Sequence, residues 1–358
     1  MRRKIFILVP SLSPTGPVKG AIALANSLIN ERQITLVSVK DGPGASAFID
    51  ERIRRVCLSA TSSGIFGRLR QYKNLLAEAG NKDEVASISM CFSADFINIF
   101  CRRYAITCSS IRGNLVNIYK MDYGILGLPI AIIHLVSLIK FDKVVAMSLP
   151  MAHQIQMFTR RRPSIIGNFV DETQLGRYRK MNNSAITNAK RFVFVGSVSS
   201  RKKPLLLVET VKKLHDEGFD LHLDLIGDGP LMKDTIDKVF DLDLREVVTI
   251  HGQLPNPYLV ISKADVFILP SLSEGTSRAS LEALFIGLPC ILRKIDGNAE
   301  LVNSGSNGIL FETDSDLYYA MLSGLELVNE QSQSIDFLPK FFRQEESSQK
   351  YLKLVEGD

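Results

Sequence analysis

Residues 264–284 read ADVFILPSLSEGTSRASLEAL and decide the fold. An apolar run of strand length ends at Pro270, a polar loop containing Gly275 follows, and the sequence from Ser277 has the pattern of a helix. In an open α/β sheet this order puts a loop and a helix N-terminus at the carboxyl end of a parallel strand, where ligands bind. Free backbone N–H groups at such a helix start favour a phosphate or sugar hydroxyls.

The same alternation of apolar runs and amphipathic helical stretches extends along the whole chain, as is typical of parallel sheets with crossover helices. The predicted strands lie near residues 4–9, 34–39, 86–91, 105–108, 143–147, 164–166, 191–195, 221–226, 247–250, 265–269 and 289–292. Because 358 residues exceed one typical core, we expect an α/β fold with two doubly wound, Rossmann-like domains.

The polar stretch 177–190 lacks apolar periodicity and is the predicted linker between the halves. A boundary within it gives an N-terminal domain over residues 1–185 and a C-terminal domain over residues 186–335. The last segment, 336–358, is expected to be mainly helical.

Charge is distributed unevenly between the two predicted domains. Residues 1–185 hold 25 lysines and arginines against 12 acidic residues, a formal charge of +13, whereas residues 186–358 carry −8. A basic half favours an anionic partner: nucleic acid, a membrane surface or a phosphorylated substrate. The chain has no recognisable nucleic-acid module, so we expect no nucleic-acid partner.

Other features favour a protein of a reducing compartment that contacts a membrane without crossing it. The five cysteines form no C-x-x-C pair, and the apolar run after Lys4 indicates a first strand and not a leader. The uncharged segment 123–139 contains Pro129 and favours a buried or interfacial helix over a membrane span. Three groups of arginines are candidate contacts for anionic head groups: Arg52/Arg54/Arg55, Arg68/Arg70 and Arg160/Arg161/Arg162.

Two carboxylates stand out in the opening stretch. Glu274 lies in the loop and Glu282 about two turns into the following helix, so both can face one crevice at different depths. Carboxylates accept hydrogen bonds from vicinal hydroxyls, which suits one to a sugar and the other to a ribose. The alternative is a capping residue beside a solvated helical glutamate.

Glu274 and Glu282 with seven residues between them, followed by Gly287-Leu288-Pro289-Cys290, closely resemble the signature of retaining glycosyltransferases of family four, which have the two-domain GT-B fold. Further motifs of that family follow in order over about residues 192–311: Phe194-Val195-Gly196, Arg201-Lys202-Lys203, Leu225-Ile226-Gly227-Asp228-Gly229-Pro230, Val248-Thr249-Ile250-His251-Gly252 and Asp296-Gly297-Asn298-Ala299-Glu300-Leu301. Several ordered motifs are a strong signal, whereas one glycine motif would be weak. Residues 10–28, where a Gly16-Pro17 turn precedes a helix, match more loosely.

The resemblance implies two domains that face a central cleft, with the last helix crossing back to the first domain. It further implies a C-terminal domain that binds a nucleotide sugar, with UDP favoured over GDP. The basic N-terminal domain would then bind a lipid-diphosphate-linked oligosaccharide in bacterial cell-surface polysaccharide, lipopolysaccharide or O-antigen synthesis. The implied location is the cytoplasm, with peripheral association at the inner face of the plasma membrane.

The resemblance also assigns roles to residues. Glu274 would contact hydroxyls of the transferred sugar, Lys202 and Arg201 would neutralise the diphosphate, and Glu282 would hold the ribose. Glu274, Lys202 and Arg201 are thus the predicted catalytic residues. The predicted donor-binding residues are Gly16, Gly196, Arg201, Lys202, Gly227, Glu274, Gly275, Thr276, Ser277 and Glu282.

Two positions depart from the family pattern. Ser197 stands where an arginine is common, and we expect Arg201 to supply that charge. The N-terminal domain has Cys108-Ser109-Ser110-Ile111-Arg112 where a histidine is usual, and we assign Arg112, with Asn114, to acceptor binding.

We expect no metal and no cofactor, with the nucleotide sugar as a substrate. Asp241-Leu242-Asp243 has the spacing of a metal-binding dyad, but it lies far from the motifs and is interpreted as a helix-end loop. Two alternatives remain open: another GT-B-fold nucleotide-sugar enzyme, such as an epimerase or phosphorylase, or a non-catalytic membrane-associated scaffold. Because Glu274, Glu282 and Lys202 are all present, decay into a scaffold is disfavoured.

Overall fold

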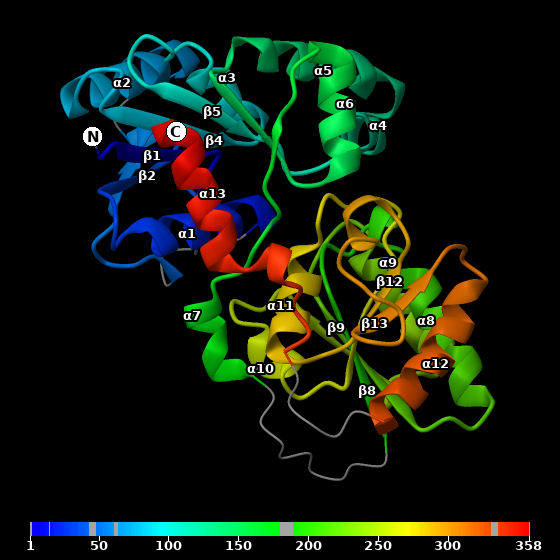
Figure 1. The fold of residues 1–358 in the computed structure, drawn as a ribbon. Coiled ribbons are helices and arrows are strands. Elements are labelled where there is room, and N and C mark those ends of the chain that lie inside the picture. Colours follow the sequence, from blue (N-terminus) through cyan, green and yellow to red (C-terminus); the bar gives the residue numbers. More distant parts are fainter. Residues whose placement is uncertain are drawn as a thin grey trace. The chain divides into compact units, whose positions relative to one another are not determined.

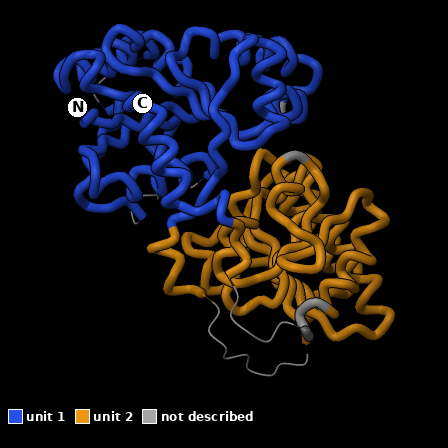
Figure 2. Tube along the Cα trace, in the orientation of Figure 1, with its two compact units in different colours: residues 1–171, 340–358 blue, residues 172–339 orange. Residues whose placement is uncertain are grey.

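The computed structural model describes residues 2–13, 15–42, 48–60, 64–179, 189–330 and 336–357. They form two compact units (Figure 2): unit 1 comprises residues 1–171 and 340–358, and unit 2 comprises residues 172–339. The predicted boundary between residues 185 and 186 lies outside the described residues. Each unit has one sheet with helices around it, so the predicted α/β class with two doubly wound sheets is confirmed (Figure 1).

Unit 1 contains a parallel sheet in the order β3-β2-β1-β4-β5-β6-β7. Its strands are β1 (Lys4–Val9), β2 (Ile34–Ser38), β3 (Arg54–Cys57), β4 (Val85–Met90), β5 (Ile106–Ser110), β6 (Lys143–Ala146) and β7 (Ser164–Ile165). Its helices are α1 (Gly16–Leu28), α2 (Gly64–Ala79), α3 (Phe92–Asn98), α4 (Leu115–Tyr123), α5 (Gly127–Ser137), α6 (Leu149–Thr159) and α13 (Gln344–Glu356), with short 3₁₀ turns η2 (Leu58–Ala60), η3 (Gly124–Leu126), η4 (Leu138–Lys140) and η8 (Lys340–Phe342).

Alternate side chains of the central strand β1 pack into two different hydrophobic cores of unit 1, one on each face of the sheet. Ile5 and Ile7 of β1 point into a core shared with α1 and α13, whereas Phe6 and Leu8 point into a core shared with α2 and α3. This two-sided burial explains why the strands are continuous apolar runs in the sequence.

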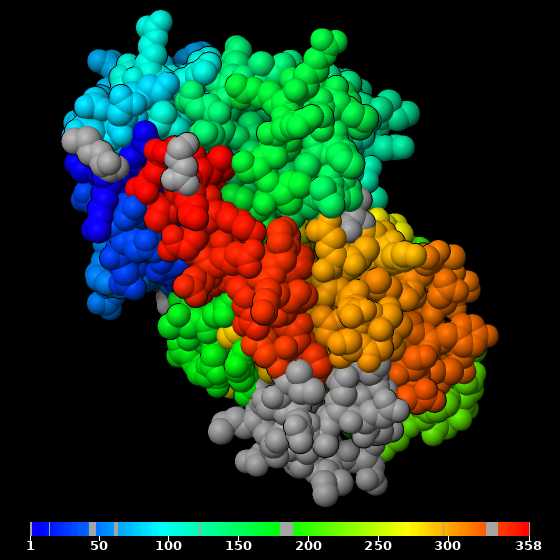
Figure 3. Space-filling view, in the orientation of Figure 1, coloured from blue at the N-terminus to red at the C-terminus, as the bar shows by residue number. Residues whose placement is uncertain are grey.

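Helix α13 completes unit 1 from the far end of the chain. It packs on α1 (Figure 3), and its Tyr351 is fully buried with its hydroxyl 2.6 Å from Ser110 Oγ of β5. The carboxylate of Glu356 accepts two hydrogen bonds from the Arg32 guanidinium. Unit 1 is therefore discontinuous in sequence, and its core needs residues that follow unit 2.

Unit 2 contains a parallel sheet in the order β10-β9-β8-β11-β12-β13. Its strands are β8 (Lys190–Val195), β9 (Leu221–Ile226), β10 (Val248–Gly252), β11 (Val266–Leu269), β12 (Cys290–Arg293) and β13 (Gly308–Phe311). Its helices are α7 (Glu172–Leu175), α8 (Pro204–Asp216), α9 (Met232–Asp241), α10 (Tyr258–Ile261), α11 (Arg278–Ile286) and α12 (Asp316–Glu330), with 3₁₀ turns η5 (Gly176–Tyr178), η6 (Ser200–Lys202) and η7 (Asp296–Asn298).

Two strands, β3 and β13, were not among those predicted. Both lie at the edge of a sheet, and β3 begins with the exposed Arg54 and Arg55, so it is not an apolar run.

The segment 123–139 begins at the last residue of α4, forms η3 and α5 and enters η4. No described helix is long and apolar enough to cross a membrane. The predicted turn at Gly16 is wrong, because Gly16 and Pro17 begin α1, where proline is favoured in the first turn.

Candidate functional site

The candidate site of unit 2 lies where its strand order changes direction. Strands β8 and β11 are neighbours in the sheet, but β9 lies on one side of the pair and β12 on the other. The loops that leave the carboxyl ends of β8 and β11 therefore diverge, which opens the crevice where wound sheets bind ligands. These loops, 196–203 and 270–277, contain most of the predicted site residues.

An ionic cluster joins the two loops. Lys202 Nζ donates a hydrogen bond to Glu274 Oε1, and Arg201 Nη1 donates to the same oxygen at 3.1 Å. Arg201 Nη1 also donates to the Ser273 carbonyl at 2.6 Å, and Leu272 N donates to the Arg201 carbonyl at 2.8 Å. The three predicted catalytic side chains are thus in direct contact.

Burial makes this cluster electrostatically sensitive. Burial lowers the pKa of the Lys202 ammonium, against the opposing influence of Glu274. Burial alone would raise the pKa of Glu274, but the charges of Lys202 and Arg201 outweigh it and hold that pKa below its ordinary value. Glu274 therefore stays ionised at neutral pH. An incoming diphosphate would compete with this carboxylate for the two cations.

Close backbone approaches around the cluster require glycine. Gly227 has φ +142°, and a Cβ there would lie 1.7 Å from the Gly196 carbonyl oxygen. A Cβ on Gly297 would lie 1.7 Å from the Gly275 carbonyl oxygen. The predicted residues Gly196, Gly227 and Gly275 thus all lie in close backbone contacts: Gly227 packs against Gly196, and Gly275 packs against Gly297 of η7.

Helix α11 begins immediately after the Glu274 loop. Ser277 is its N-cap, and its side-chain oxygen accepts a hydrogen bond from Ser280 N at 3.3 Å. Glu282 is only 2% exposed, and its Oε1 accepts a hydrogen bond from the Tyr258 hydroxyl at 3.2 Å. The alternative interpretation of Glu282 as a solvated helical glutamate is therefore wrong.

Buried polar atoms near the Glu274 loop also point to a ligand. Ser273 Oγ and Asn298 Oδ1 are buried and have no hydrogen-bond partner among the described residues. Thr276, also a predicted donor-binding residue, is buried in the same loop. Burying an unpaired polar atom costs free energy, and a hydroxyl-rich ligand would remove that cost.

Sequence reasoning gave no role to Tyr258 or Asn298. A tyrosine in a short helix carries no motif, so Tyr258 could be found only from its contact with Glu282. Asn298 lies in a motif of the family resemblance, and its position after Gly297 was the available signal.

The remaining predicted residues belong to unit 1. Gly16 is the first residue of α1, and a Cβ there would meet open space. The Arg112 guanidinium contacts the sulfur atoms of Met90, at 3.0 Å, and Met147, at 3.6 Å. No described carboxylate forms an ion pair with it. Asn114 caps α4, and its Oδ1 accepts hydrogen bonds from Asn117 N and Gln154 Nε2.

The residues dismissed as metal ligands lie at the end of a helix, as predicted. Asp241 ends α9, and Asp243 follows with φ +54° and pairs with Arg245 at 3.4 Å. Within the described ranges, no group of three or more histidine, cysteine or acidic residues is arranged to hold a metal ion. His134 is buried with both ring nitrogens in hydrogen bonds, as a core histidine should be.

Comparisons with known proteins agree with this geometry. Residues 189–326 match the family "Glycosyl transferases group 1". The chain is 36% identical over 131 residues to the UDP-Gal:alpha-D-GlcNAc-diphosphoundecaprenol alpha-1,3-galactosyltransferase of Escherichia coli, covering 35% of this chain and 33% of that protein. It is 27% identical over 172 residues to a diphospho-undecaprenol N-acetylgalactosaminyltransferase of Campylobacter jejuni, covering 48% and 45%. The matched stretches thus span less than half of either relative.

Solved structures show the same fold over the whole chain. A TarM variant of Staphylococcus aureus, crystallised with UDP, superposes with a TM-score of 0.78 at 13% identity and covers 99% of this chain and 100% of its own. HepE of Anabaena, crystallised with UDP and glucose, gives 0.77 at 17% identity with full coverage of both chains. The predicted resemblance to GT-B glycosyltransferases is therefore confirmed.

Proposed function

We propose that this chain is a retaining glycosyltransferase that moves a sugar from a UDP-sugar to a lipid-diphosphate-linked acceptor. The observation that carries the proposal is the contact of Lys202, Arg201 and Glu274 at the strand-order reversal of unit 2. Two cations and one carboxylate there suit a donor that presents a diphosphate beside a sugar.

The cations act on the leaving group. As the bond between the sugar and the diphosphate breaks, negative charge grows on the departing oxygen, and fixed positive charges in a buried site stabilise it. Lys202 is only 7% exposed, so water screens its charge weakly. We expect no metal to be needed, and the backbone amides at the start of α11 would add to the positive potential.

Glu274 changes partner when the donor binds. Once the diphosphate takes over Lys202 and Arg201, the carboxylate is free to accept hydrogen bonds from hydroxyls of the transferred sugar. Glu282, oriented by Tyr258, would hold the ribose hydroxyls. Retention is inferred from the family resemblance, with front-face attack by the acceptor hydroxyl assisted by the departing phosphate.

The donor and acceptor classes rest on the relatives and on unit 1. The Escherichia coli relative is named for a UDP-sugar and a diphosphoundecaprenol acceptor, and the TarM and HepE structures contain UDP. In unit 1, Arg112 has sulfur contacts but no described ion-pair partner, which suits a phosphate of the acceptor. Such acceptors belong to cell-surface polysaccharide synthesis, and the chain would act at the membrane surface that holds them.

A transfer assay with a diphosphoundecaprenol-linked sugar, run with the Glu274→Gln variant, tests the proposal. Turnover should fall about a hundredfold, since a sugar contact is lost, while UDP affinity by calorimetry is not weakened, because the diphosphate loses a competitor for the two cations. Glu312→Gln is the matched control, because Glu312 is an exposed partner of Lys294 in the same unit. Transfer should continue in a chelator. Release of free or epimerised sugar without an acceptor would instead identify another class of enzyme.

A further inference from the structure

Five aromatic side chains form a continuous row in unit 1, from Phe100, just after α3, along α3 and onto α4. Successive ring centroids lie 5.7 Å apart for Phe100 and Phe96, 6.5 Å for Phe96 and Phe92, 6.3 Å for Phe92 and Tyr119, and 6.2 Å for Tyr119 and Tyr123. Phe100, Phe96, Phe92 and Tyr123 keep 47%, 46%, 37% and 58% of their surface exposed. Contiguous apolar exposure of this kind marks an interaction surface.

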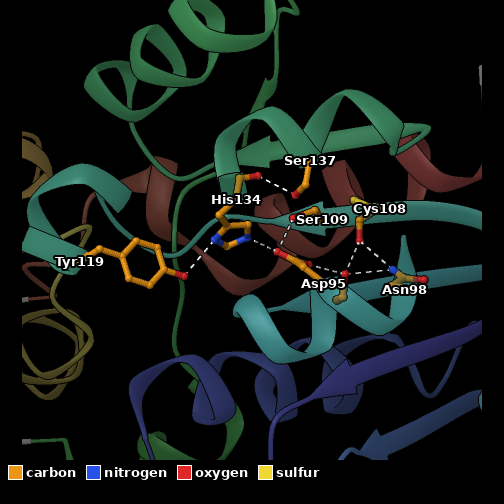
Figure 4. Close-up of polar contacts among 8 residues, drawn as sticks. Asp95, Asn98, Cys108, Ser109, Tyr119, His134 and Ser137 are labelled. Atoms are coloured by element: carbon orange, nitrogen blue, oxygen red, sulfur yellow. Dashed lines mark hydrogen bonds and ion pairs between the residues drawn. The ribbon is translucent and has the colours of Figure 1, made fainter. Parts of the chain in front are cut away.

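A buried polar network holds Tyr119 of this row and Asp95 of α3 in place (Figure 4). His134 Nε2 lies 2.9 Å from Asp95 Oδ2, and His134 Nδ1 lies 3.1 Å from the Tyr119 hydroxyl. Asp95 also accepts hydrogen bonds from Ser89 Oγ, at 2.6 Å, and Ser109 Oγ, at 2.9 Å. Because the network ties α3, α4 and α5 to β4 and β5, the exposed rings belong to a fixed surface.

The apolar exposure continues along the chain beyond Tyr123. Ile125 and Leu126 of η3 are each 79% exposed, more than any other described isoleucine, leucine or valine. Helix α5 then exposes Ile132, Ile133 and Val136 while it buries its other face, and it contains no charged residue. A helix that is apolar on all sides needs an apolar environment on its outer face too.

A basic cavity lies at the Phe100 end of the row. It has a volume of about 670 Å³ and is lined by Lys73, Lys82, Ile99, Phe100, Arg102, Arg103 and Tyr104. Asp142 pairs with Arg102 at 2.7 Å and with Lys82 at 3.6 Å. No described carboxylate pairs with Lys73, whose Nζ lies 6.0 Å from the Phe100 ring centroid, or with Arg103. The charges of Lys73 and Arg103, which line the cavity beside Ile99 and Phe100, are therefore not neutralised by any described carboxylate.

We propose that the aromatic row and this cavity together form the docking surface for an anionic phospholipid leaflet, with the rings in the interfacial layer and a lipid phosphate in the cavity. Tyrosine is enriched at that layer, exposed phenylalanine rings bury apolar area at its boundary with the acyl chains, and basic side chains favour anionic head groups. A second copy of this chain is a poor occupant, because unit 1 is strongly basic and two such faces would repel. The inference rests on the proposed function, since it says how the enzyme reaches a lipid-linked acceptor.

Sedimentation of the full chain with phosphatidylcholine vesicles, with and without phosphatidylglycerol, tests this surface. The wild type should bind the anionic vesicles, and Lys73→Gln with Arg103→Gln should weaken that binding on the order of thirtyfold. Phe96→Ala with Phe100→Ala should weaken it on the order of tenfold and leave a more salt-sensitive remainder.

Matched double variants of unit 2 control for charge and apolar area. Lys233→Gln with Lys263→Gln changes the same charge at exposed positions, and Phe219→Ala with Phe240→Ala removes two exposed rings. Both should bind vesicles as the wild type does, and all variants should retain UDP affinity, which shows that unit 2 is folded.

Three results would overturn the proposal. The first is vesicle binding that the unit 1 variants leave unchanged. The second is displacement of the protein from vesicles by millimolar inorganic phosphate, which would identify a soluble anion as the ligand of the cavity, and the third is a dimer in solution whose interface covers the rings. Loss of UDP binding by the wild type would instead refute the proposed function and leave the docking result intact.

Discussion

The sheets of the two units run outward from a central pair of strands, β1 and β4 in unit 1 and β8 and β11 in unit 2, with the same order of connection. At the carboxyl end of the pair in unit 2, opposite charges meet in a buried cluster. Unit 1 instead has Arg112 without a described ion-pair partner and, on its helices, an exposed aromatic row. Divided this way, the chain carries a formal charge of +11 in unit 1 and −6 in unit 2.

Under the two proposals made above, one type of wound sheet supports two kinds of recognition. A nucleotide sugar is small and polar, so its site is built from loops at fixed distances from the strand ends, and its residues recur at fixed sequence spacings. A membrane is large and unstructured, so a surface for it needs only exposed apolar area and charge. The first kind leaves a motif in the sequence and the second does not.

The largest expected effect tests whether the units are energetically separate. Tyr351→Ala removes a fully buried ring from the core that α13 completes, and unit 1 should lose about 3–5 kcal/mol of stability while UDP affinity is retained. Hydrogen exchange read by mass spectrometry resolves the two units. Tyr319→Ala, at a 66% exposed position in α12, is the control and should change little. Equal loosening of both units would show a single cooperative domain.

The next effect sharpens the difference in cation use. Lys202→Ala should lower kcat/KM about a hundredfold and weaken UDP binding, because the developing phosphate charge loses a buried partner. Lys203→Ala is the matched neighbour, since Lys203 pairs with the half-exposed Asp314 outside the cluster. Steady-state kinetics and calorimetry on both variants measure the contrast. Indistinguishable variants would remove Lys202 from the site.

A smaller effect concerns Tyr258, which we regard as a positioning residue for Glu282. Tyr258→Phe removes the 3.2 Å hydrogen bond and should weaken UDP binding by about 1 kcal/mol, roughly fivefold. The loss should disappear with 2′-deoxy-UDP if Glu282 holds the ribose hydroxyl. Tyr318→Phe, whose hydroxyl contacts the exposed Glu217, is the control. An equal loss with both nucleotides would place Glu282 elsewhere.

The smallest expected effect is the pH dependence of the unfolding free energy that Glu274 contributes, which is absent near neutral pH and appears only in acid. Its pKa in the folded chain lies below the ordinary value of 4.5, so its contribution to stability is complete above about pH 4.5 and is lost as the pH falls through the folded-state value. The difference in unfolding free energy between the wild type and Glu274→Gln should therefore be constant near neutral pH and shrink in acid. Chemical denaturation across the acid range measures it; a difference that grows in acid would contradict the assigned shift.

Much of the fold could be predicted because buried parallel strands are continuous apolar runs. The exceptions have physical reasons: β3 is a basic edge strand, and β13 is a four-residue edge strand that begins with Gly308. In the site, Glu274, Lys202 and Arg201 were identified by the family resemblance, and the structure adds that they bind one another. The role of Tyr258 depends on packing between segments distant in sequence, so no local pattern revealed it. In the aromatic row, Phe92, Phe96 and Phe100 are spaced by four residues, but the continuation to Tyr119 depends on such packing.

The path of α13 has a consequence for the order in which the chain matures on the ribosome. Unit 2 is contiguous, so all of it is synthesised before residues 340–358. At about 5–20 residues per second, the first 171 residues wait on the order of ten to thirty seconds for the helix that covers α1. During that interval the nascent chain leaves the apolar side of α1 uncovered, which is the kind of exposed surface that makes a folding intermediate prone to aggregation.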